Sequence, residues 1–160
     1  MGDNIRIMIV DDEERFLNTL AQRLRLRDFD VAAFSNGQEA VEAARSREFD
    51  LAIVDLKMPG MTGEQVLEII KNERPLTEVI ILTGHGSIPS AVHCTQVGSY
   101  NYLQKPCETD ELLEVLKNAY QRRVQKKLKI DQEKMEKMLD TSLGESPLGI
   151  LRRLRDIDKG

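Results

Sequence analysis

The segment AIVDLKMPGMTG, residues 52–63, places a carboxylate at the end of an apolar run and follows it with a proline and two glycines. A short apolar run that ends in turn-forming residues is typical of a buried strand, so we expect Asp55 to be carried to the edge of a sheet. An aspartate at such a place has two interpretations. It caps a turn or helix, or it acts as a nucleophile or metal ligand. This segment alone leaves both open.

The pattern of this segment, an apolar run followed by an amphipathic stretch, occurs five times along the chain. Apolar strands covered on both faces and alternating with helices predict an α/β fold with an open, parallel, doubly wound sheet. We expect strands at 5–10, 30–35, 51–55, 78–84 and 100–104. We expect helices at 13–27, 36–47, 62–73, 87–98 and in a last stretch that begins after Thr109.

Three of these helices carry recognisable end signals. Ser35 and Gln38 stand in capping-box spacing before the second helix, and Thr62 and Gln65 do so before the third. Gly98 is placed to close the fourth helix. These signals support the predicted boundaries.

Charged and hydroxyl side chains follow four of the five expected strands. In a doubly wound sheet the ligand site lies at the carboxyl ends of the strands, so these side chains are expected to converge. Clustered carboxylates repel one another unless a cation intervenes, and hard oxygen ligands suit Mg²⁺. A metal ion and a lysine together can neutralise an incoming phosphoryl group, which Asp55 would accept as an acyl phosphate. The residues are Asp11, Asp12, Asp55, Thr83 and Lys105.

The order and spacing of four motifs resemble the receiver domain of two-component response regulators, the CheY-like superfamily, and in particular the receivers of sigma-54 activators. The resemblance covers roughly residues 4–120 and implies a five-stranded, flavodoxin-like sheet. The motifs are IMIVDDE (7–13), LAIVDLKMPGMTG (51–63), IILTGHG (80–86) and YLQKP (102–106).

The resemblance implies a role for each residue of the acidic pocket. Asp55 corresponds to the phospho-acceptor and a direct Mg²⁺ ligand. Asp12 corresponds to the acidic Mg²⁺ ligand, and Asp11 to a second acid that acts through water. The backbone carbonyl of Lys57 would complete the metal site, and Lys105 would contact the phosphoryl group.

The resemblance also implies a switch. Thr83 corresponds to the switch hydroxyl, and Tyr102 to an aromatic side chain that turns inward on phosphorylation. The alternative for Tyr102 is a surface tyrosine on an edge strand. Pro106 is expected to follow a cis peptide bond after Lys105. Lys57 and His85 lie where the family varies and tunes dephosphorylation.

Composition and charge narrow the class of protein. The chain has 160 residues and a formal net charge of −4, so no overall basic field attracts nucleic acid. Residues 121–160 hold 11 Lys/Arg and 7 Asp/Glu, a net charge of +4 that leaves −8 for residues 1–120. Cys94 and Cys107 fit no metal-ligand spacing, and no apolar run approaches about 18 residues. We therefore expect a cytoplasmic protein with reduced thiols.

Residues 121–160 are expected to form a helical extension beyond the receiver. Residues 110–140 contain no Gly or Pro, and apolar residues recur there in steps of three and four, which suggests a short, imperfect coiled coil. The alternatives are a plain charged helix or a segment that docks a partner. These apolar residues are Leu113, Leu116, Tyr120, Val124, Leu128, Met135 and Met138.

A break in this extension is expected at 141–149, followed by a short basic amphipathic piece at 150–160. The letters LGESPLGIL, residues 143–151, faintly resemble the opening of the ATPase module of sigma-54 activators. A receiver piece of a larger transcriptional regulator is therefore an alternative to a stand-alone module.

The leading hypothesis is a phosphorylation-switched signalling module rather than a metabolic enzyme. A sensor histidine kinase or phosphotransfer protein would supply the phosphoryl group, and the switch would alter homodimerisation, through the tail or the 87–104 face, or partner binding. A hydrolase with an aspartyl-phosphate intermediate is a weaker alternative, because such enzymes place a second acid where Lys57 stands. Direct DNA binding is not expected, since the tail is too short for an output domain.

Overall fold

The structure is a computed structural model, in which residues 4–141 and 147–159 are described. Residue contacts divide the chain into two units, Met1–Arg123 and Val124–Gly160, and each is described by itself.

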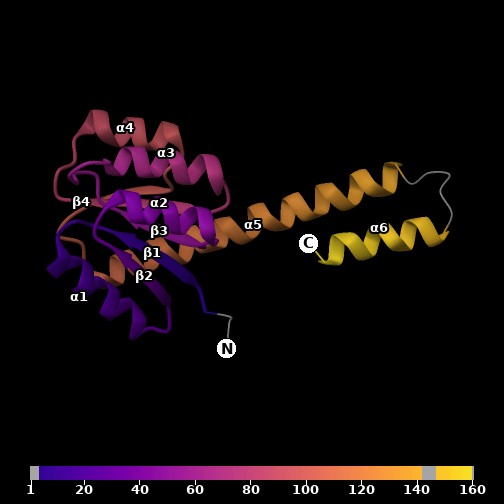
Figure 1. Ribbon diagram of the computed structural model, residues 1–160, viewed down its shortest axis with the longest axis horizontal. Helices are drawn as coiled ribbons and strands as arrows, with labels where there is room; N and C mark the ends of the chain where they lie inside the picture. Colours follow the sequence, from indigo (N-terminus) through magenta and orange to yellow (C-terminus); the bar gives the residue numbers. More distant parts are fainter. Residues whose placement is uncertain (1–3, 142–146, 160) are drawn as a thin grey trace. The chain divides into compact units, whose positions relative to one another are not determined.

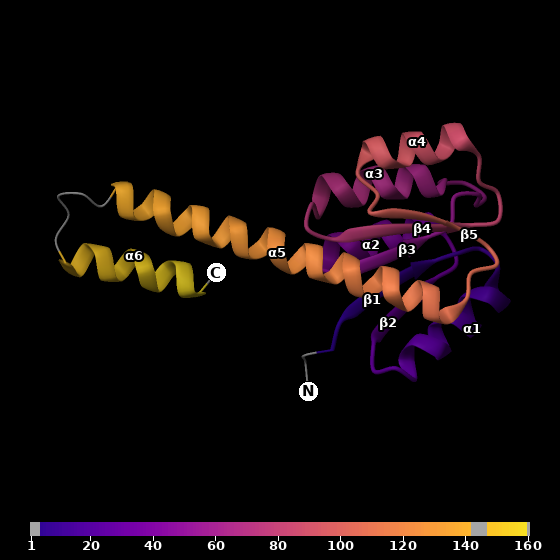
Figure 2. The same ribbon diagram turned by 180° about the vertical axis from the view of Figure 1, so that it is seen from behind.

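The first unit contains one sheet of five parallel strands in the order β2-β1-β3-β4-β5 (Figure 1; β5 is labelled in Figure 2). This arrangement confirms the predicted fold class. The jump from β2 past β1 to β3 reverses the strand order, and the site of a doubly wound sheet is expected beside such a reversal. The strands are β1 (Arg6–Val10), β2 (Asp30–Phe34), β3 (Leu51–Val54), β4 (Glu78–Thr83) and β5 (Asn101–Gln104).

Helices cover both faces of the sheet, as Figures 1 and 2 show from opposite sides. Residues of α2, α3 and α4 pack on one face, and residues of α1 and α5 pack on the other. β3 and β4 are buried along their whole length because both of their faces are covered. The helices are α1 (Glu14–Arg25), α2 (Gly37–Ser46), α3 (Gly63–Glu73), α4 (Ile88–Val97) and α5 (Thr109–Thr141).

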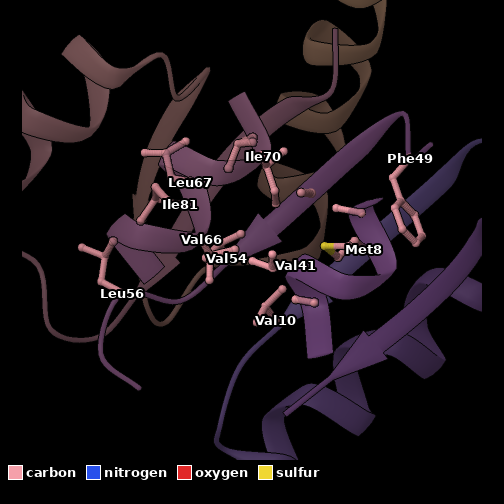
Figure 3. Packing of buried hydrophobic residues seen from close by; sticks show 14 of the residues in the cluster. Met8, Val10, Val41, Phe49, Val54, Leu56, Val66, Leu67, Ile70 and Ile81 are labelled. Carbon is pink, nitrogen blue, oxygen red and sulfur yellow. The ribbon is translucent and has the colours of Figure 1, made fainter. Parts of the chain in front are cut away.

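The core under α2 and α3 holds β3 in place from one side (Figure 3). Val54, the last residue of β3, packs there with Val66 of α3 and Val41 of α2. Since Asp55 follows Val54 directly, the position of the carboxylate is set by this packing. Burial of such aliphatic side chains stabilises the fold by about 1.5–3 kcal/mol each.

The helix ends agree with the predicted signals except at α2. Thr62 and Gln65 form a complete capping box at the start of α3, and Gly98 ends α4 with φ +118°. Asn36, not Ser35, caps α2, because its side-chain oxygen accepts the Glu39 N–H at 2.9 Å. The predicted capping box of Ser35 is therefore wrong by one residue, since an asparagine in extended backbone caps a helix as well as serine does.

Ion pairs hold α5 against the amino ends of β3 and β4, at the end of the sheet opposite Asp55. The buried Arg123 guanidinium lies 3.0 Å from Asp50 and 3.3 Å from Glu48. Arg122 lies 3.1 Å from the buried Glu78, the first residue of β4. Buried acids need such partners, because an unpaired charge in the interior is costly.

The second unit consists of the part of α5 beyond Arg123 together with α6 (Pro147–Lys159). The predicted break at 141–149 is too long, because α5 includes Thr141 and α6 already begins at Pro147, a residue that the first turn of a helix tolerates. Residues 142–146 lie outside the described residues. Several apolar side chains of this part of α5 are exposed: Val124, Leu128, Ile130, Met135 and Leu139. Among the described residues, no helix is both long and apolar enough to cross a membrane.

Candidate phosphorylation and metal site

Three carboxylates meet at the carboxyl ends of β1 and β3. Val10 and Val54 are partners in the parallel ladder, so Asp11 and Asp55, the residues that follow them, lie side by side. One oxygen each of Asp11, Asp12 and Asp55 lies within 4.8 Å of the others. Asp11 and Asp55 are each only 2% exposed, and Asp12 lies nearer the surface. The predicted acidic cluster is therefore present.

Lys105, which follows β5, reaches across to these acids. Its Nζ lies 2.7 Å from Asp11 Oδ2, 3.2 Å from Glu13 Oε1 and 4.0 Å from Asp55 Oδ2. The ammonium also lies over the Phe16 ring, 4.1 Å from its centroid. Lys105 is thus held by Asp11, Glu13 and Phe16 within reach of Asp55.

The electrostatics of the pocket favour an added cation. Burial raises the pKa of Asp11, and the charge of Asp55 adds to this effect, although the hydrogen bonds from Lys105 and from the Glu13 N–H oppose it. Burial alone would lower the pKa of Lys105. The hydrogen bond and charge of Asp11, with Asp55 and Glu13, outweigh that effect and raise its pKa. Lys105 therefore stays protonated, while the acids still repel one another.

Asp55 itself is incompletely paired. Both of its carboxylate oxygens are buried, and neither has a hydrogen-bond partner among the described residues. A buried polar atom without a partner costs about 1–3 kcal/mol, and a charged one more. Three oxygen donors with unused bonding capacity are the donor set that Mg²⁺ takes, usually while keeping several of its waters. The residues present therefore fit this ion.

Thr83 ends β4 next to this pocket and is fully buried. Its hydroxyl oxygen accepts the His85 N–H at 3.1 Å, and its carbonyl accepts the Lys105 N–H at 2.9 Å. The first bond holds the loop that follows β4, and the second joins the end of β4 to the residue after β5. The Lys105–Pro106 peptide bond that follows is cis.

A hollow of about 490 Å³ opens beside Asp12 and gives access to the pocket. Lys57, Met58 and Pro59 line one side, and His85 and Glu13 also contribute. The structure thus places Lys57 and His85 beside the pocket, where the sequence predicted them. The metal role of the Lys57 carbonyl stays a prediction.

The start of α3 lies against the backbone that leaves β3. The Gly63 N–H donates to the Leu56 carbonyl at 2.8 Å. A Cβ atom on Gly63 would overlap the Asp55 carbonyl oxygen and lie 2.7 Å from Leu56 Cα. Only glycine permits this close approach, which folds residues 55–63 into a tight loop.

Tyr102 lies inward rather than at the surface. Its ring packs against the core under α3 and α4. Its hydroxyl is buried and has no hydrogen-bond partner among the described residues. The ring therefore already lies inward without a phosphoryl group, and the predicted inward turn of Tyr102 on phosphorylation stays a prediction.

Three contributors to the pocket were not predicted from the sequence: Glu13, Phe16 and Gly63. Glu13 follows the Asp11-Asp12 pair directly, so its position was a usable signal. Phe16 was predicted only as an inward apolar residue of α1, and its contact with Lys105 joins chain segments 89 residues apart. The close approach at Gly63 depends on the three-dimensional path of the loop.

The sequence that forms this pocket matches a known protein family. Residues 7–117 match the family described as the response regulator receiver domain, so the chain belongs to this family. A relative named "Putative response regulator NtrX-like", from Rickettsia bellii, is 37% identical over 117 residues, which are 72% of this chain and 24% of the relative. The chain thus spans about a quarter of the length of this relative.

Two solved structures extend the similarity to the fold. A CheY-like receiver domain protein from Methanospirillum hungatei has a TM-score of 0.76 and 29% identity, and the match covers 78% of this chain and 99% of that one. A response regulator from Burkholderia pseudomallei has a TM-score of 0.68 and 26% identity, with 95% and 93% covered. That structure carries a phosphorylated aspartic acid, a calcium ion and citrate. The chain is therefore a response regulator receiver with a CheY-like fold.

Proposed function

We propose that this receiver accepts a phosphoryl group on Asp55 from a sensor histidine kinase or phosphotransfer protein. The observation that carries the proposal is the state of the Asp55 carboxylate: it is buried, both oxygens lack hydrogen-bond partners among the described residues, and Lys105 lies 4.0 Å away. A group arranged in this way is prepared for chemistry rather than for stability. The phosphorylated aspartic acid of the Burkholderia relative supports the assignment.

The transfer follows from the chemistry of these groups. An Asp55 carboxylate oxygen attacks the phosphorus of the donor, and the bond from phosphorus to the donor nitrogen or oxygen breaks, with its electron pair leaving on the donor. Lys105 balances charge on the phosphoryl oxygens, and the Thr83 hydroxyl donates a hydrogen bond to one of them.

Asp12, Asp55, Asp11 through water, and the Lys57 carbonyl would hold Mg²⁺. When bound, the ion neutralises charge on the carboxylates and the phosphoryl group. The close approach of Asp11, Asp12 and Asp55 supports this proposal.

Mg²⁺ is expected to stabilise the folded protein even without a phosphodonor, because it relieves repulsion among three acids. At ten times its Kd the ion should add about 1.4 kcal/mol to the free energy of unfolding, measured by thermal melts with and without a chelator. Asp12→Asn should lose most of this gain, whereas Glu14→Gln, a change of the same type at an exposed acid, should keep it. Equal stabilisation of both variants would contradict the metal site.

Adding a small phosphodonor, such as acetyl phosphate, tests whether the metal supports phosphorylation of the protein. One phosphoryl group per chain should be incorporated with Mg²⁺ and essentially none with chelator. Turnover of a phosphate ester beyond one equivalent would instead favour the hydrolase alternative. The lysine at position 57, where such hydrolases carry a second acid, supports the non-enzymatic proposal.

The output of the switch is proposed to be self-association or partner binding. The exposed apolar residues of α5 beyond Arg123 support homodimerisation, because Leu128 is 63% exposed and Met135, seven residues on, is 45% exposed. Residues seven apart occupy the same position of a coiled-coil heptad. The 87–104 face is the other candidate surface, and Ile88 there is 82% exposed.

The double variant Leu128→Glu/Met135→Glu is expected to shift the full-length protein from dimer to monomer in sedimentation velocity. The reason is that four like charges, two from each chain, would face one another in the seam. Lys129→Glu is the matched control, since it changes the net charge by the same amount at a neighbouring exposed position. Unchanged sedimentation of the double variant would remove the tail as the dimer interface and leave the 87–104 face.

The location and the wider architecture are also proposals. A cytoplasmic location agrees with the partner class and with the absence of a membrane-spanning helix among the described residues. The match covers only 24% of the Rickettsia relative, which is much longer than this receiver. This supports the alternative that the receiver works within a larger transcriptional regulator. Direct DNA binding by residues 121–160 is not proposed.

A further inference from the structure

The loop between β4 and α4 passes directly over the ring of Tyr102. A Cβ atom on Gly86, in this loop, would lie 2.5 Å from the Tyr102 hydroxyl oxygen, 3.0 Å from Cε1 and 3.2 Å from Cζ. Such separations are below ordinary van der Waals contact, so with a larger residue at position 86 either the Tyr102 ring or the loop has to shift.

We propose that Gly86 is a positioning residue that admits Tyr102 to its inward place. This inference rests on the predicted switch role of Tyr102, and it identifies what admits the ring to the inward position that the switch is predicted to adopt. Gly86 is not needed for an unusual backbone conformation, because its φ lies outside the left-handed region. The requirement for glycine therefore comes from the space that the Tyr102 ring occupies.

The loop is anchored on both sides of Gly86. On one side the His85 N–H donates to the Thr83 hydroxyl at 3.1 Å. On the other side Ser87 caps α4: its hydroxyl accepts the Ser90 N–H at 3.2 Å, and its carbonyl accepts the Ala91 N–H at 2.9 Å. Movement of Gly86 would strain these bonds.

The Tyr102 ring is the easier partner to move. Its backbone is fixed in β5, paired with Ile81 of β4, but its hydroxyl has no hydrogen-bond partner among the described residues. The inward ring is therefore held by packing and not by a hydrogen bond at its tip. Rotation about the side-chain bonds takes the hydroxyl to water and restores its hydrogen bonding.

The arrangement links Thr83 to Tyr102 through three consecutive loop residues. The His85 N–H donates to the Thr83 hydroxyl. If this hydroxyl turns to another partner, that hydrogen bond is lost and the loop above the ring loses one anchor. Residue 86 thus sets how readily Tyr102 stays inward before any phosphoryl group arrives, and it thereby shapes the 87–104 face.

The test places 3-fluorotyrosine in full-length protein carrying Tyr100→Phe and Tyr120→Phe, so that Tyr102 gives the only fluorine resonance. In Gly86→Ala the resonance is expected to move toward the value of a solvent-exposed tyrosine, with a larger shift on transfer to D₂O. Gly84→Ala is the matched control, because its Cβ would make only an ordinary 3.9 Å contact with Lys105 and should leave the resonance in place. Unfolding curves of both variants check that the fold is kept, as expected for an exposed loop.

An unmoved Tyr102 resonance in folded Gly86→Ala would overturn the proposal, since the loop rather than the ring would then have given way. The measurement is made first without Mg²⁺ or phosphodonor, so this result does not depend on phosphorylation. Addition of Mg²⁺ and beryllofluoride then tests the switch itself. If Gly86→Ala moves the ring outward and beryllofluoride does not return it inward, the positioning role stands and the predicted inward switch of Tyr102 fails.

Discussion

Asp55→Asn is expected to abolish incorporation of phosphate from acetyl phosphate in the presence of Mg²⁺. The amide is a far weaker nucleophile than the carboxylate, and it also removes one of the three anionic metal ligands. Intact-protein mass spectrometry of the wild type and the variant, treated side by side, measures the loss. Equal labelling of the two proteins would refute Asp55 as the phospho-acceptor.

The same variant should be more stable than the wild type when no metal is added. Replacing a buried carboxylate by a neutral amide removes charge repulsion with Asp11, and we expect a gain on the order of 1 kcal/mol in the free energy of unfolding. Urea unfolding in chelator measures this difference. A gain in stability with loss of labelling would show that the lost reaction is not caused by misfolding.

Gly63→Ala is expected to cost about 3 kcal/mol of stability, at the upper end of the range for overpacked sites. The added methyl group would overlap the Asp55 carbonyl oxygen, and the obstacle is backbone rather than a flexible side chain. Relief requires α3 to move away from the end of β3, which would break the bond from the Gly63 N–H to Leu56. Urea unfolding measures the cost, and slower labelling should accompany it, because the loop that holds Lys57 moves.

Gly60→Ala separates steric overlap from the backbone cost of replacing a glycine. Gly60 has φ +74°, but a Cβ atom there would meet nothing within 4 Å. Its cost should be the 1–2 kcal/mol or so of a left-handed residue, without the displacement of α3. If Gly63→Ala cost less than Gly60→Ala, the loop would be more adaptable than its close contact implies.

The order of elements was predictable because it depends on short-range patterns. The apolar run LAIV and the run VIIL within EVIILT indicate strands buried on both faces, and the structure has these strands at Leu51–Val54 and Glu78–Thr83. With a parallel sheet, the residues that follow these runs must share one edge. Alternation thus brings Asp11, Asp12 and Asp55 to one edge of the sheet, and the pairing of β1 with β3 makes them a cluster.

The contacts that tune the site were not predictable, because they join segments whose approach depends on tertiary packing. The approach of Lys105 to Phe16 depends on how the start of α1 lies relative to the loop after β5, and the sequence contains no pattern for it. The Ser35 prediction failed for a more local reason. Two good capping residues, Ser35 and Asn36, stand side by side, and a spacing rule cannot choose between them.

The ion pairs of Arg122 and Arg123 bear on where this receiver can be cut. The family match ends at residue 117, and a boundary after residue 120 agrees with the motifs. A chain shortened to either point would keep Asp50 and Glu78 in the interior and discard an arginine that faces each of them. Asp50 would keep Arg6 and Glu78 would keep Lys71 as partners, so only part of the charge balance would be lost. Reduced stability from this loss should not be read as a signalling role of the tail. A piece that keeps the ion pairs of both arginines has to extend through Arg123.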